Sequence, residues 1–454
     1  MSTIAAISTP AGTGGIAVIR ISGTGALTVA DSMCERFAAG KSVMDVPGGR
    51  TARVRIKDEE DAVLDDGVIT VFRAPASYTG EDVVEISCHG GAYITRMVLR
   101  SAIVHGAIPA GPGEFTKRAF LNGKLSLTQA EAVMGLISAG GKSSAKAALS
   151  LLEGSLSREL CRIRDELTDT AAHISAWIDF PEEDVEEVSH EVLGAALNRA
   201  NKAIAVLVDG YDRGKLVSEG INAVICGRPN VGKSTLMNLL AGCEKSIVAD
   251  IAGTTRDVVE ESILLDGYTI RLSDTAGLRD TGDVVESIGV DRARKCMAQA
   301  DLILAVFEGS EEPKKEDFDL IEELKDRKYI AVVNKSDLGQ KIPSSLFETA
   351  QAVVLISAKT GEGFNELRSA VLTALELNEF DAAAPLLAGE RQFYCAKNAL
   401  QAVKEAEEAL YTGMTLDAVW VCVQSAVAAL CELDGTSADE SMIEGVFKNF
   451  CVGK

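Results

Sequence analysis

The chain has 454 residues, more than one hydrophobic core accommodates, so we expect two to four domains. Its 47% hydrophobic and 25% charged residues favour a soluble protein, and we expect no membrane span and no signal peptide. The net charge of −22 excludes a generally basic nucleic-acid-binding face, so any RNA contact should come from a local patch or from a partner. We therefore predict a cytoplasmic protein without membrane contact.

Cysteine and histidine usage excludes two further classes of protein. Ten cysteines are scattered along the chain without a C-x-x-C pair, and only four histidines occur. This pattern fits neither a zinc site nor a disulfide framework. We expect most of the cysteines to be small, buried, apolar side chains.

Short apolar segments alternate with turn residues over residues 1–120, which indicates a mixed α+β domain. Its helix is expected at 92–104 and a loop rich in helix breakers at 111–115, and its strands are expected at 4–8, 15–21, 53–56, 67–72 and 83–88. Arg20, Glu85 and Lys124 lie at or near the ends of apolar segments. From the residues alone, ordinary solvation of strand ends explains all three.

Beyond about residue 125 the pattern becomes helical. Apolar residues at spacings of three and four over 149–177 predict one long amphipathic helix, which should end near 179–181 because Pro181 breaks the backbone pairing. A second helix is predicted over 184–215, with Val192 among its inward-facing residues. Both apolar stripes are interpreted as packing surface rather than as a cofactor site.

Strands and helices alternate over residues 217–378, which is typical of a doubly wound parallel sheet. The helical pattern returns at 389–411 and 415–433, and the polar sequence at 437–440 predicts the start of a last short helix. Because helices lie on both sides of the α/β region in the sequence, we predict that this region is inserted into a helical domain.

The sequence Gly-Arg-Pro-Asn-Val-Gly-Lys-Ser at residues 227–234 lies where the expected strand 221–226 turns into a helix. That context predicts a P-loop, in which backbone amides surround phosphate, Lys233 reaches the terminal phosphates and the Ser234 hydroxyl ligates Mg²⁺. The alternative is a chance glycine-rich turn. The flanking strand and helix, and four further motifs downstream, argue against it.

Three of these motifs stand at successive strand ends. Asp274, at the start of Asp-Thr-Ala-Gly, can hold the water shell of Mg²⁺, and the Gly277 amide can sense a γ-phosphate. Asp337, in Asn-Lys-Ser-Asp, suits the N1 and N2 donors of guanine, which adenine does not offer, and residues 357–359 can close over the base. The sequence therefore predicts GTP rather than ATP as the ligand.

The fourth motif lies in residues 249–257, where Thr255 is placed to complete the Mg²⁺ shell in a switch segment. Leu278 stands where many signalling GTPases place a water-orienting glutamine, and Glu286 is the nearest candidate to replace it. A solvated helix carboxylate is an equally good interpretation of Glu286. No arginine finger can be assigned, so a monovalent cation is a candidate for the developing charge, with a side-chain oxygen from Asn230.

Long stretches outside the α/β region also resemble one known family, the tRNA-modification GTPases of the MnmE (TrmE) type. The resemblance runs from the N-terminus to the last residue, and the stretches that carry it are 14–23, 80–85, 89–91, 112–124 and the terminal Phe-Cys-Val-Gly-Lys of 450–454.

The resemblance implies a multidomain α/β architecture: an N-terminal α+β domain for tetrahydrofolate binding and dimerisation at 1–120, a helical domain at 121–216 and 381–454, and an inserted Ras-like G domain at 217–380. It also implies a homodimer, a tRNA substrate, and an FAD-dependent MnmG (GidA)-type partner in a heterotetramer or larger complex. A tetrahydrofolate derivative (5-formyl- or methylene-tetrahydrofolate) would carry the one-carbon unit for modification of the wobble uridine.

By position, the resemblance implies roles for individual residues. Arg20, Glu85, Lys124 and Lys454 match the folate-binding residues, which replaces strand-end solvation as the interpretation of the first three. Cys451 matches a cysteine beside the expected modification site, and Glu286 matches the water-orienting glutamate. K⁺ would be ligated by Asn230, Ala249, Ile251 and Thr254, and Mg²⁺ by Ser234 and Thr255. The full set implied to contact GTP or GDP is Asn230, Val231, Gly232, Lys233, Ser234, Thr235, Ala249, Asp250, Ile251, Ala252, Gly253, Thr254, Thr255, Asp274, Thr275, Ala276, Gly277, Asn334, Lys335, Asp337, Ser357, Ala358 and Lys359.

Three functions remain open at this point. The first is K⁺-stimulated GTP hydrolysis within an enzyme that adds a carboxymethylaminomethyl-type group to C5 of uridine 34 of certain tRNAs. The second is a GTPase switch of the ribosome-assembly type without modification chemistry of its own. The third, a folate-dependent one-carbon transferase acting on a small molecule, is weakened by the intact GTPase motifs.

Overall fold

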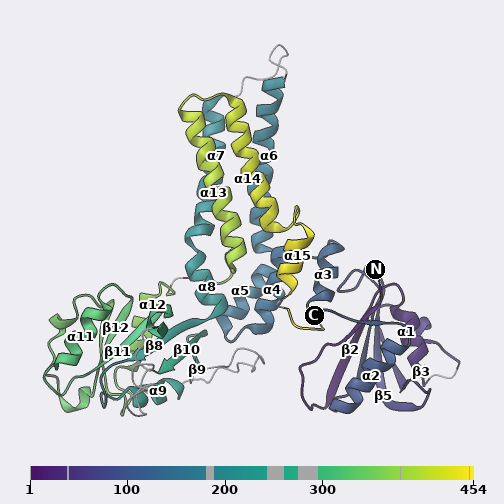
Figure 1. Cartoon of the computed structure of the whole chain (residues 1–454), viewed down its shortest axis with the longest axis horizontal. Coiled ribbons are helices and arrows are strands. Elements are labelled where there is room, and N and C mark those ends of the chain that lie inside the picture. The colour runs from purple at the N-terminus through teal and green to yellow at the C-terminus, as the bar shows by residue number, and fades with distance from the viewer. Residues whose placement is uncertain are drawn as a thin grey trace. The chain divides into compact units, whose positions relative to one another are not determined.

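The computed structural model describes residues 2–37, 40–179, 189–242, 260–274, 295–378, 380–448 and 450–453. The chain forms two units. The first joins Met1–Met134 with Leu430–Lys454, and the second is Gly135–Ala429 (Figure 1). Segments from both ends of the sequence thus build one unit.

The first unit contains a seven-stranded sheet in the order β3-β4-β5-β6-β2-β1-β7. All its pairs are antiparallel except β1 with β7. Helices α1 (Ala26–Met33) and α2 (Ala92–Val104) pack on one face, over a core that includes Ile19, Ile69 and Ile86. The strands are β1 Ile4–Ile7, β2 Ile16–Ser22, β3 Cys34–Arg36, β4 Arg50–Lys57, β5 Val63–Phe72, β6 Val83–His89 and β7 Ile108–Pro109.

The predicted α+β class of this region is confirmed, and two local predictions change. Helix α1 lies in a segment for which the sequence predicted no element. The expected loop at 111–115 already contains the start of α3 (Glu114–Leu121). Gly113 directly before it has a φ of 62° and the Phe450 side chain would lie 2.7 Å from a Cβ at this position. The chain therefore turns into the helix over a glycine that no larger residue can replace without a shift.

A second small core in the first unit is built by α3, the start of α4 (Leu127–Ser138) and α15 (Glu440–Phe447). Leu127, Phe447 and Phe450 are buried in it. The short helix α15 confirms the expected last helix, and the Asp439 side chain caps it by accepting a hydrogen bond from the Met442 amide at 2.7 Å.

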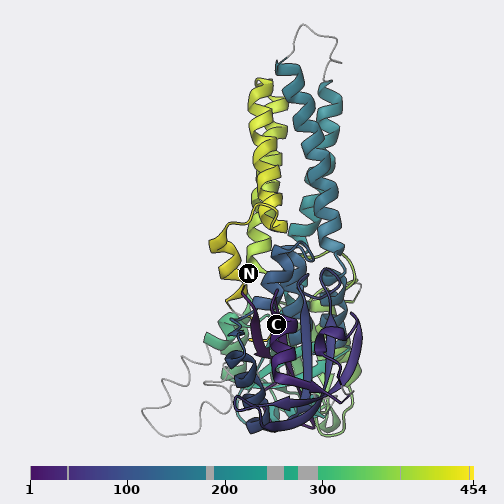
Figure 2. The same cartoon turned by 90° about the vertical axis from the view of Figure 1, so that its right-hand side faces the viewer.

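The second unit contains the long helices, and α6, α7, α13 and most of α14 run side by side (Figures 1 and 2). The single helix predicted over 149–177 is wrong, because the chain breaks at Gly154, with a φ of 83°. The helix predicted over 184–215 also divides, at Gly210, and Val192 is 65% exposed rather than inward-facing. The helices are α5 Lys142–Leu152, α6 Ser155–Asp179, α7 His190–Asp209, α8 Tyr211–Glu219, α13 Glu390–Tyr411 and α14 Leu416–Asp434.

Helix α14 changes one further expectation. By length and composition this helix of 19 residues could cross a membrane, with a mean hydropathy of 1.6, whereas the sequence was expected to hold no such run. Val419, Val423 and Leu430 on it are buried, although only 28% of the apolar window is buried. Length and composition alone are weak evidence for a membrane span.

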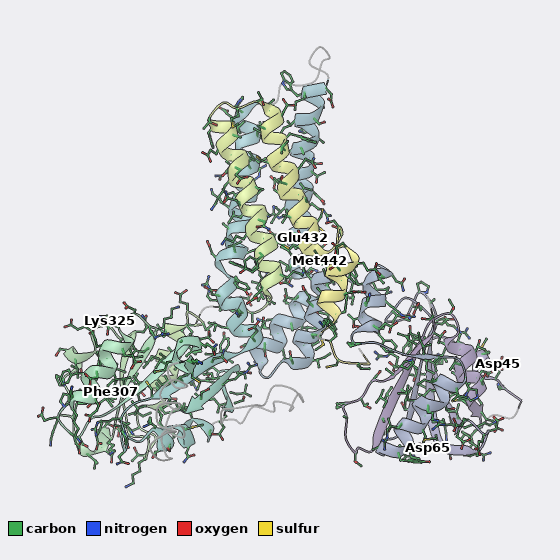
Figure 3. The ribbon with its side chains drawn as sticks, viewed as in Figure 1. Asp45, Asp65, Phe307, Lys325, Glu432 and Met442 are labelled. Atoms are coloured by element: carbon green, nitrogen blue, oxygen red, sulfur yellow. The ribbon has the colours of Figure 1, made fainter. Side chains whose placement is uncertain are left out.

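The second unit also contains a six-stranded sheet in the order β13-β12-β11-β8-β10-β9. Its strands are parallel, as predicted, except β9, which forms an antiparallel hairpin with β10. Phe307 on β11, labelled in Figure 3, is fully buried. Its ring centroid lies 4.7 Å from that of Phe347. The strands are β8 Ile221–Cys226, β9 Glu260–Leu265, β10 Tyr268–Asp274, β11 Leu302–Glu308, β12 Tyr329–Asn334 and β13 Ala352–Ile356, and the helices beside them are α9 Lys233–Ala241, α11 Lys315–Leu324 and α12 Phe364–Ala374.

Candidate functional site

The predicted phosphate loop, residues 227–234, connects β8 to α9, as its flanking sequence indicated. Three of its residues have a positive φ: 147° at Gly227, 66° at Asn230 and 97° at Gly232. A Cβ at Gly227 would lie 2.3 Å from the Val306 carbonyl oxygen, and one at Gly232 would lie 2.2 Å from the Asn334 amide nitrogen. The two glycines are therefore required by backbone conformation and by close approach of neighbouring strands.

The Lys233 side chain lies across the phosphate loop. Its Nζ donates to the carbonyl oxygens of Gly227 at 3.1 Å and Arg228 at 2.9 Å, and the residue is 8% exposed. Ser234 and Thr235, in the first turn of α9, are exposed. A buried ammonium beside two exposed hydroxyls at a helix N-terminus can bind an anion together with a metal counter-ion.

Asn334 joins three of the predicted motifs. Its Nδ2 donates to the Val231 carbonyl oxygen of the phosphate loop at 2.8 Å, and its Oδ1 accepts from the Ala358 amide at 2.9 Å. The side chain is buried, and the residue is 3% exposed. Asp337 is exposed three residues further on, in the 3-10 turn Ser336–Leu338. The structure therefore brings the end of β12, the end of β13 and the phosphate loop together.

A charged cluster behind this loop was not predicted from the sequence. Glu308 at the end of β11 accepts a hydrogen bond from Lys335 Nζ at 2.6 Å, and its other carboxylate oxygen lies 3.5 Å from Arg228 Nη2. Arg228 also contacts Glu311 at 3.1 Å and lies 3.4 Å from the buried Asp317. Burial raises the pKa of Glu308, but its bonds to Lys335 and Ser310 outweigh this effect, and the pKa lies below its ordinary value.

Of the remaining predicted nucleotide residues, one lies at a described strand end and the others lie outside the described residues. Asp274 ends β10, at the strand end where it was expected. The proposed switch and cation residues Ala249, Asp250, Ile251, Ala252, Gly253, Thr254 and Thr255, the motif residues Thr275, Ala276 and Gly277, and Glu286 lie outside the described residues.

In the first unit, Arg20 on β2 and Glu85 on β6 are cross-strand partners in the antiparallel register. The guanidinium donates from Nε to Glu85 Oε1 at 2.9 Å, with Nη2 2.8 Å from the same oxygen. The Arg20 guanidinium also lies 5.6 Å from the ring centroids of Tyr78 and Phe115. Burial raises the pKa of Tyr78, partly opposed by its bond to Thr116 and by Arg20. The pair thus lies mid-strand, beside aromatic rings, and not at solvated strand ends.

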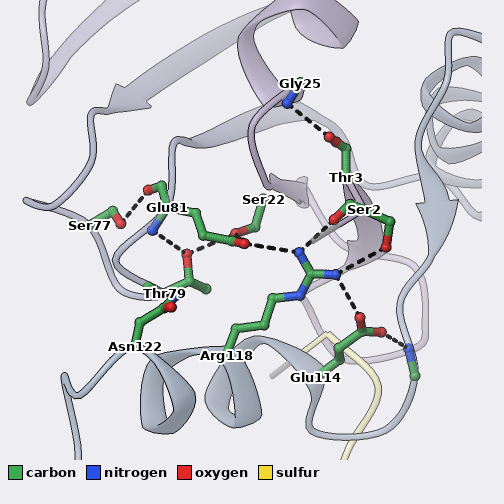
Figure 4. A network of polar contacts seen from close by, with 11 residues as sticks. Ser2, Thr3, Ser22, Gly25, Ser77, Thr79, Glu81, Glu114, Arg118 and Asn122 are labelled. Carbon is green, nitrogen blue, oxygen red and sulfur yellow. Dashed lines mark hydrogen bonds and ion pairs between the residues drawn. The ribbon is translucent and has the colours of Figure 1, made fainter.

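A network of polar contacts centred on Arg118 lies in the same unit (Figure 4). The Arg118 side chain on α3 is 5% exposed and lies 3.0 Å from Glu81 Oε2 and 2.8 Å from Glu114 Oε1. Its Nη1 also donates to the Ser2 carbonyl oxygen at 2.6 Å. Glu81 in turn accepts from the Ser22 hydroxyl at 2.8 Å. This network connects the N-terminus, β2, the loop before β6 and α3.

Lys124 and the C-terminal residues contact three different segments of the first unit. Lys124 Nζ donates to the Pro75 carbonyl oxygen at 3.2 Å, in the segment that carries Tyr78. The exposed Cys451 accepts a backbone hydrogen bond from Gly113 at 3.2 Å, and Ser8 donates to the Gly453 carbonyl oxygen at 3.0 Å. Lys454 lies outside the described residues.

One cavity in this unit was not predicted. It has a volume of about 520 Å³ and lies between the glycine-rich loop of residues 9–14 and the start of α2, with Arg96 at its wall. Within the described part of the chain, no three histidine, cysteine, aspartate or glutamate side chains are grouped to hold a metal ion.

Comparison with known proteins covers the whole chain. The family model for the N-terminus of the GTP-binding protein TrmE matches residues 3–124, and that for the MnmE helical domain matches residues 127–451. The tRNA modification GTPase MnmE of Bacillus subtilis (strain 168) is 40% identical, and that of Bacillus licheniformis is 41% identical, each over 100% of both chains. The solved G domain of the T. maritima FeoB iron transporter matches 34% of this chain and 98% of its own at 30% identity, with a TM-score of 0.27.

Proposed function

The chain belongs to the family of tRNA modification GTPases called MnmE or TrmE, and from this premise we propose that its GTP hydrolysis serves the modification of C5 of the wobble uridine in certain tRNAs. It is a GTPase enzyme of the hydrolase class. The observation that carries the nucleotide part of the proposal is the Asn334 side chain, which links the phosphate loop to the end of β13.

The proposed nucleotide chemistry assigns one task to each motif. Lys233 and the amides of the phosphate loop bind the phosphates, Ser234 and Thr255 hold Mg²⁺, and Asp337 selects guanine. Glu286 orients the attacking water. Oxygens of Asn230, Ala249, Ile251 and Thr254 would hold K⁺, and the ion would supply positive charge beside the phosphates when two G domains pair. Equal turnover in K⁺ and Na⁺ at matched ionic strength would remove the cation from this scheme.

The proposed modification chemistry belongs to the first unit. A tetrahydrofolate derivative would bind beside Arg20, Glu85, Lys124 and Lys454, with the exposed Cys451 near the modification site. The Arg20–Glu85 pair next to Tyr78 and Phe115 supports this, since a planar ring system with polar edges suits aromatic faces and charged partners. The protein would act as a homodimer with an FAD-dependent MnmG (GidA)-type partner.

The proposed domain boundaries remain those of the sequence: 1–120, 121–216, 217–380 and 381–454, with the G domain inserted between the two helical parts. In the first unit α15 packs with α3 and α4 in one small core. This contact supports the proposal that C-terminal residues lie beside the N-terminal domain.

Analysis of tRNA nucleosides tests the central claim. A strain that lacks the protein should lose the carboxymethylaminomethyl-type modification at uridine 34, and the wild-type gene should restore it. Lys233→Met should not restore it, because the phosphate loop loses its ammonium, whereas Lys328→Met, at an exposed site of the same unit, should. An unchanged nucleoside profile in the deletion strain would refute the proposal.

The alternative, a GTPase switch without modification chemistry of its own, differs in its need for folate. Calorimetry with 5-formyltetrahydrofolate should show binding by the wild type, weakened by Arg20→Ala. Arg100→Ala removes an exposed arginine of the same unit, paired with Glu59 at 2.8 Å, and should leave the affinity unchanged. Absence of binding, or equal effects of both variants, would favour the switch.

A further inference from the structure

We propose that Glu308 is a positioning residue of the nucleotide site, because its buried carboxylate joins Arg228 of the phosphate loop to Lys335 of the guanine motif and thereby slows the release of bound GDP. The inference rests on the guanine-nucleotide binding proposed above and not on the tRNA chemistry. A failure of the modification test would leave it standing.

The two carboxylate oxygens of Glu308 serve different motifs. Oε1 accepts from Lys335 Nζ at 2.6 Å and from the Ser310 hydroxyl at 3.0 Å. Oε2 lies 3.5 Å from Arg228 Nη2. The side chains of Glu308 and Arg228 are 9% and 10% exposed, so the contact is shielded from water and weakly screened. A shift of either basic residue is therefore transmitted to the other through one carboxylate.

The backbone of Lys335 shows what this link can position. Lys335 has a φ of 65°, a left-handed conformation that is uncommon for a residue other than glycine. It directly precedes the 3-10 turn Ser336–Leu338, which carries Asp337, and directly follows Asn334, which contacts the phosphate loop. Holding the Lys335 side chain against β11 therefore helps to set the orientation of the guanine-binding turn relative to the phosphate loop.

The surrounding charges make Glu308 replaceable without loss of the fold. Without the Glu308 charge, Arg228 still faces the buried Asp317 and the half-exposed Glu311, and the Lys335 side chain is 31% exposed and reaches water. The pKa of Glu308, lowered by its partners despite burial, is consistent with an ionised carboxylate at neutral pH. Glu308→Gln removes the charge and keeps the size and the bond to Ser310.

Glu311→Gln is a matched control in the same cluster. Glu311 makes the same kind of contact to Arg228, at 3.1 Å, but its side chain is 45% exposed and its second partner is Lys314 on the surface. The substitution is chemically identical and touches the phosphate-loop side only. A difference between the two variants therefore reports the link to Lys335.

The test measures the dissociation rate of a fluorescent GDP analogue from the full-length protein by stopped flow. Glu308→Gln should release GDP about tenfold faster, the size of effect expected when one charged hydrogen bond is lost, and Glu311→Gln should stay within about twofold of the wild type. Competition with IDP, which lacks the 2-amino group, should show a reduced preference for GDP only in Glu308→Gln.

Three results would overturn the proposal: GDP release at the wild-type rate in Glu308→Gln, equal effects of the two glutamine variants, or an unchanged ratio of GDP to IDP affinity. Should Glu308→Gln fail to fold, Arg228→Gln breaks the link from the other end and leaves Glu308 paired with Lys335. It should release GDP faster than Glu311→Gln, and equal rates would count against the proposal.

Discussion

The nucleotide site and the Arg20–Glu85 site are stabilised in different ways. At the phosphate loop, backbone groups lie at the centre: glycines permit close approach, and the Asn334 amide bonds to main-chain groups on both sides. In the first unit, charged side chains from separate elements meet, with Arg118 in contact with Glu81, Glu114 and Ser2. A site built from backbone groups needs particular residues close together in the sequence. A network of charged side chains can instead join residues that are far apart in the sequence.

This difference predicts which substitutions lower the stability of a unit and which lower only its affinity for a ligand. Breaking a buried charge network should lower the stability of the unit that contains it, because unpaired charges remain in a poorly solvated place. Breaking a backbone-directed contact at a ligand site should mainly lower the affinity for the ligand, because the sheet behind it keeps its own core. Substitutions at the two sites test this separation.

The largest effect is expected for Arg118→Met, which keeps an unbranched apolar side chain but removes the guanidinium and its charge. Two carboxylates would lose their positively charged partner, and breaking a buried ion pair costs about 3–5 kcal/mol. Calorimetric unfolding of the full chain should show a transition of the first unit at lower temperature, while affinity for GDP stays unchanged. Arg162→Met is the control, since Arg162 is 53% exposed and pairs with Glu159 on the surface of α6, and it should cost less than about 1 kcal/mol. A loss of GDP affinity in Arg118→Met would contradict the separation.

The fold and the nucleotide site follow from local sequence to a large extent. The phosphate loop, the strand ends at Asp274, Asn334 and Ile356, and the helix at Glu440–Phe447 lie where sequence spacing predicted them. The turn of β9 into β10 also carried a readable signal that was missed: Asp266-Gly267, with φ values of 51° and 84°, is the two-residue turn typical of an antiparallel hairpin.

Other features could not be read from local sequence. The leucine spacing continues across Gly154, so periodicity alone does not reveal that α5 ends and α6 begins there. The Arg20–Glu85 pair joins residues 65 apart, and the contact between Arg118 and Ser2 spans 116 residues. Such contacts depend on which strands are neighbours in the sheet. The strand order is a property of the whole unit and cannot be read from a local segment.

The second effect in size is expected for Asn334→Ala. The side chain makes two buried hydrogen bonds to main-chain groups, and their loss leaves the Val231 carbonyl and the Ala358 amide unpaired, at about 1–2 kcal/mol each. We expect about a hundredfold loss of GDP affinity, measured by fluorescence titration, with the stability of the first unit unchanged. Asn222→Ala provides the control: Asn222 lies at the exposed start of β8, bonded to Asp301 at 3.2 Å, and its loss should not alter GDP affinity. Equal affinities in the two variants would show that Asn334 does not organise the site.

The smallest expected effect is a difference in chemical reactivity among cysteines of the first unit. Cys34 and Cys88 are buried in the core between the sheet and its helices. Burial, reinforced by Asp31, raises the pKa of Cys34 from 9.0 to about 12, and burial with Asp65 raises that of Cys88 to about 11. Since the thiolate is the reactive form, both should remain protonated and inert at pH 8, whereas the exposed Cys451 should react with iodoacetamide in the native protein.

Peptide mass spectrometry after a short labelling at pH 8 checks this order. Cys451 should be modified first, and Cys34 and Cys88 should react only after urea unfolds the unit and returns their pKa values toward 9.0. The same experiment on Arg118→Met sharpens the comparison of the two sites. If the charge network supports the unit, Cys34 and Cys88 should become reactive at lower urea concentration than in the wild type, and they should not do so in Asn334→Ala. Identical urea profiles for all three proteins would mean that the network around Arg118 contributes no stability to the core beside it.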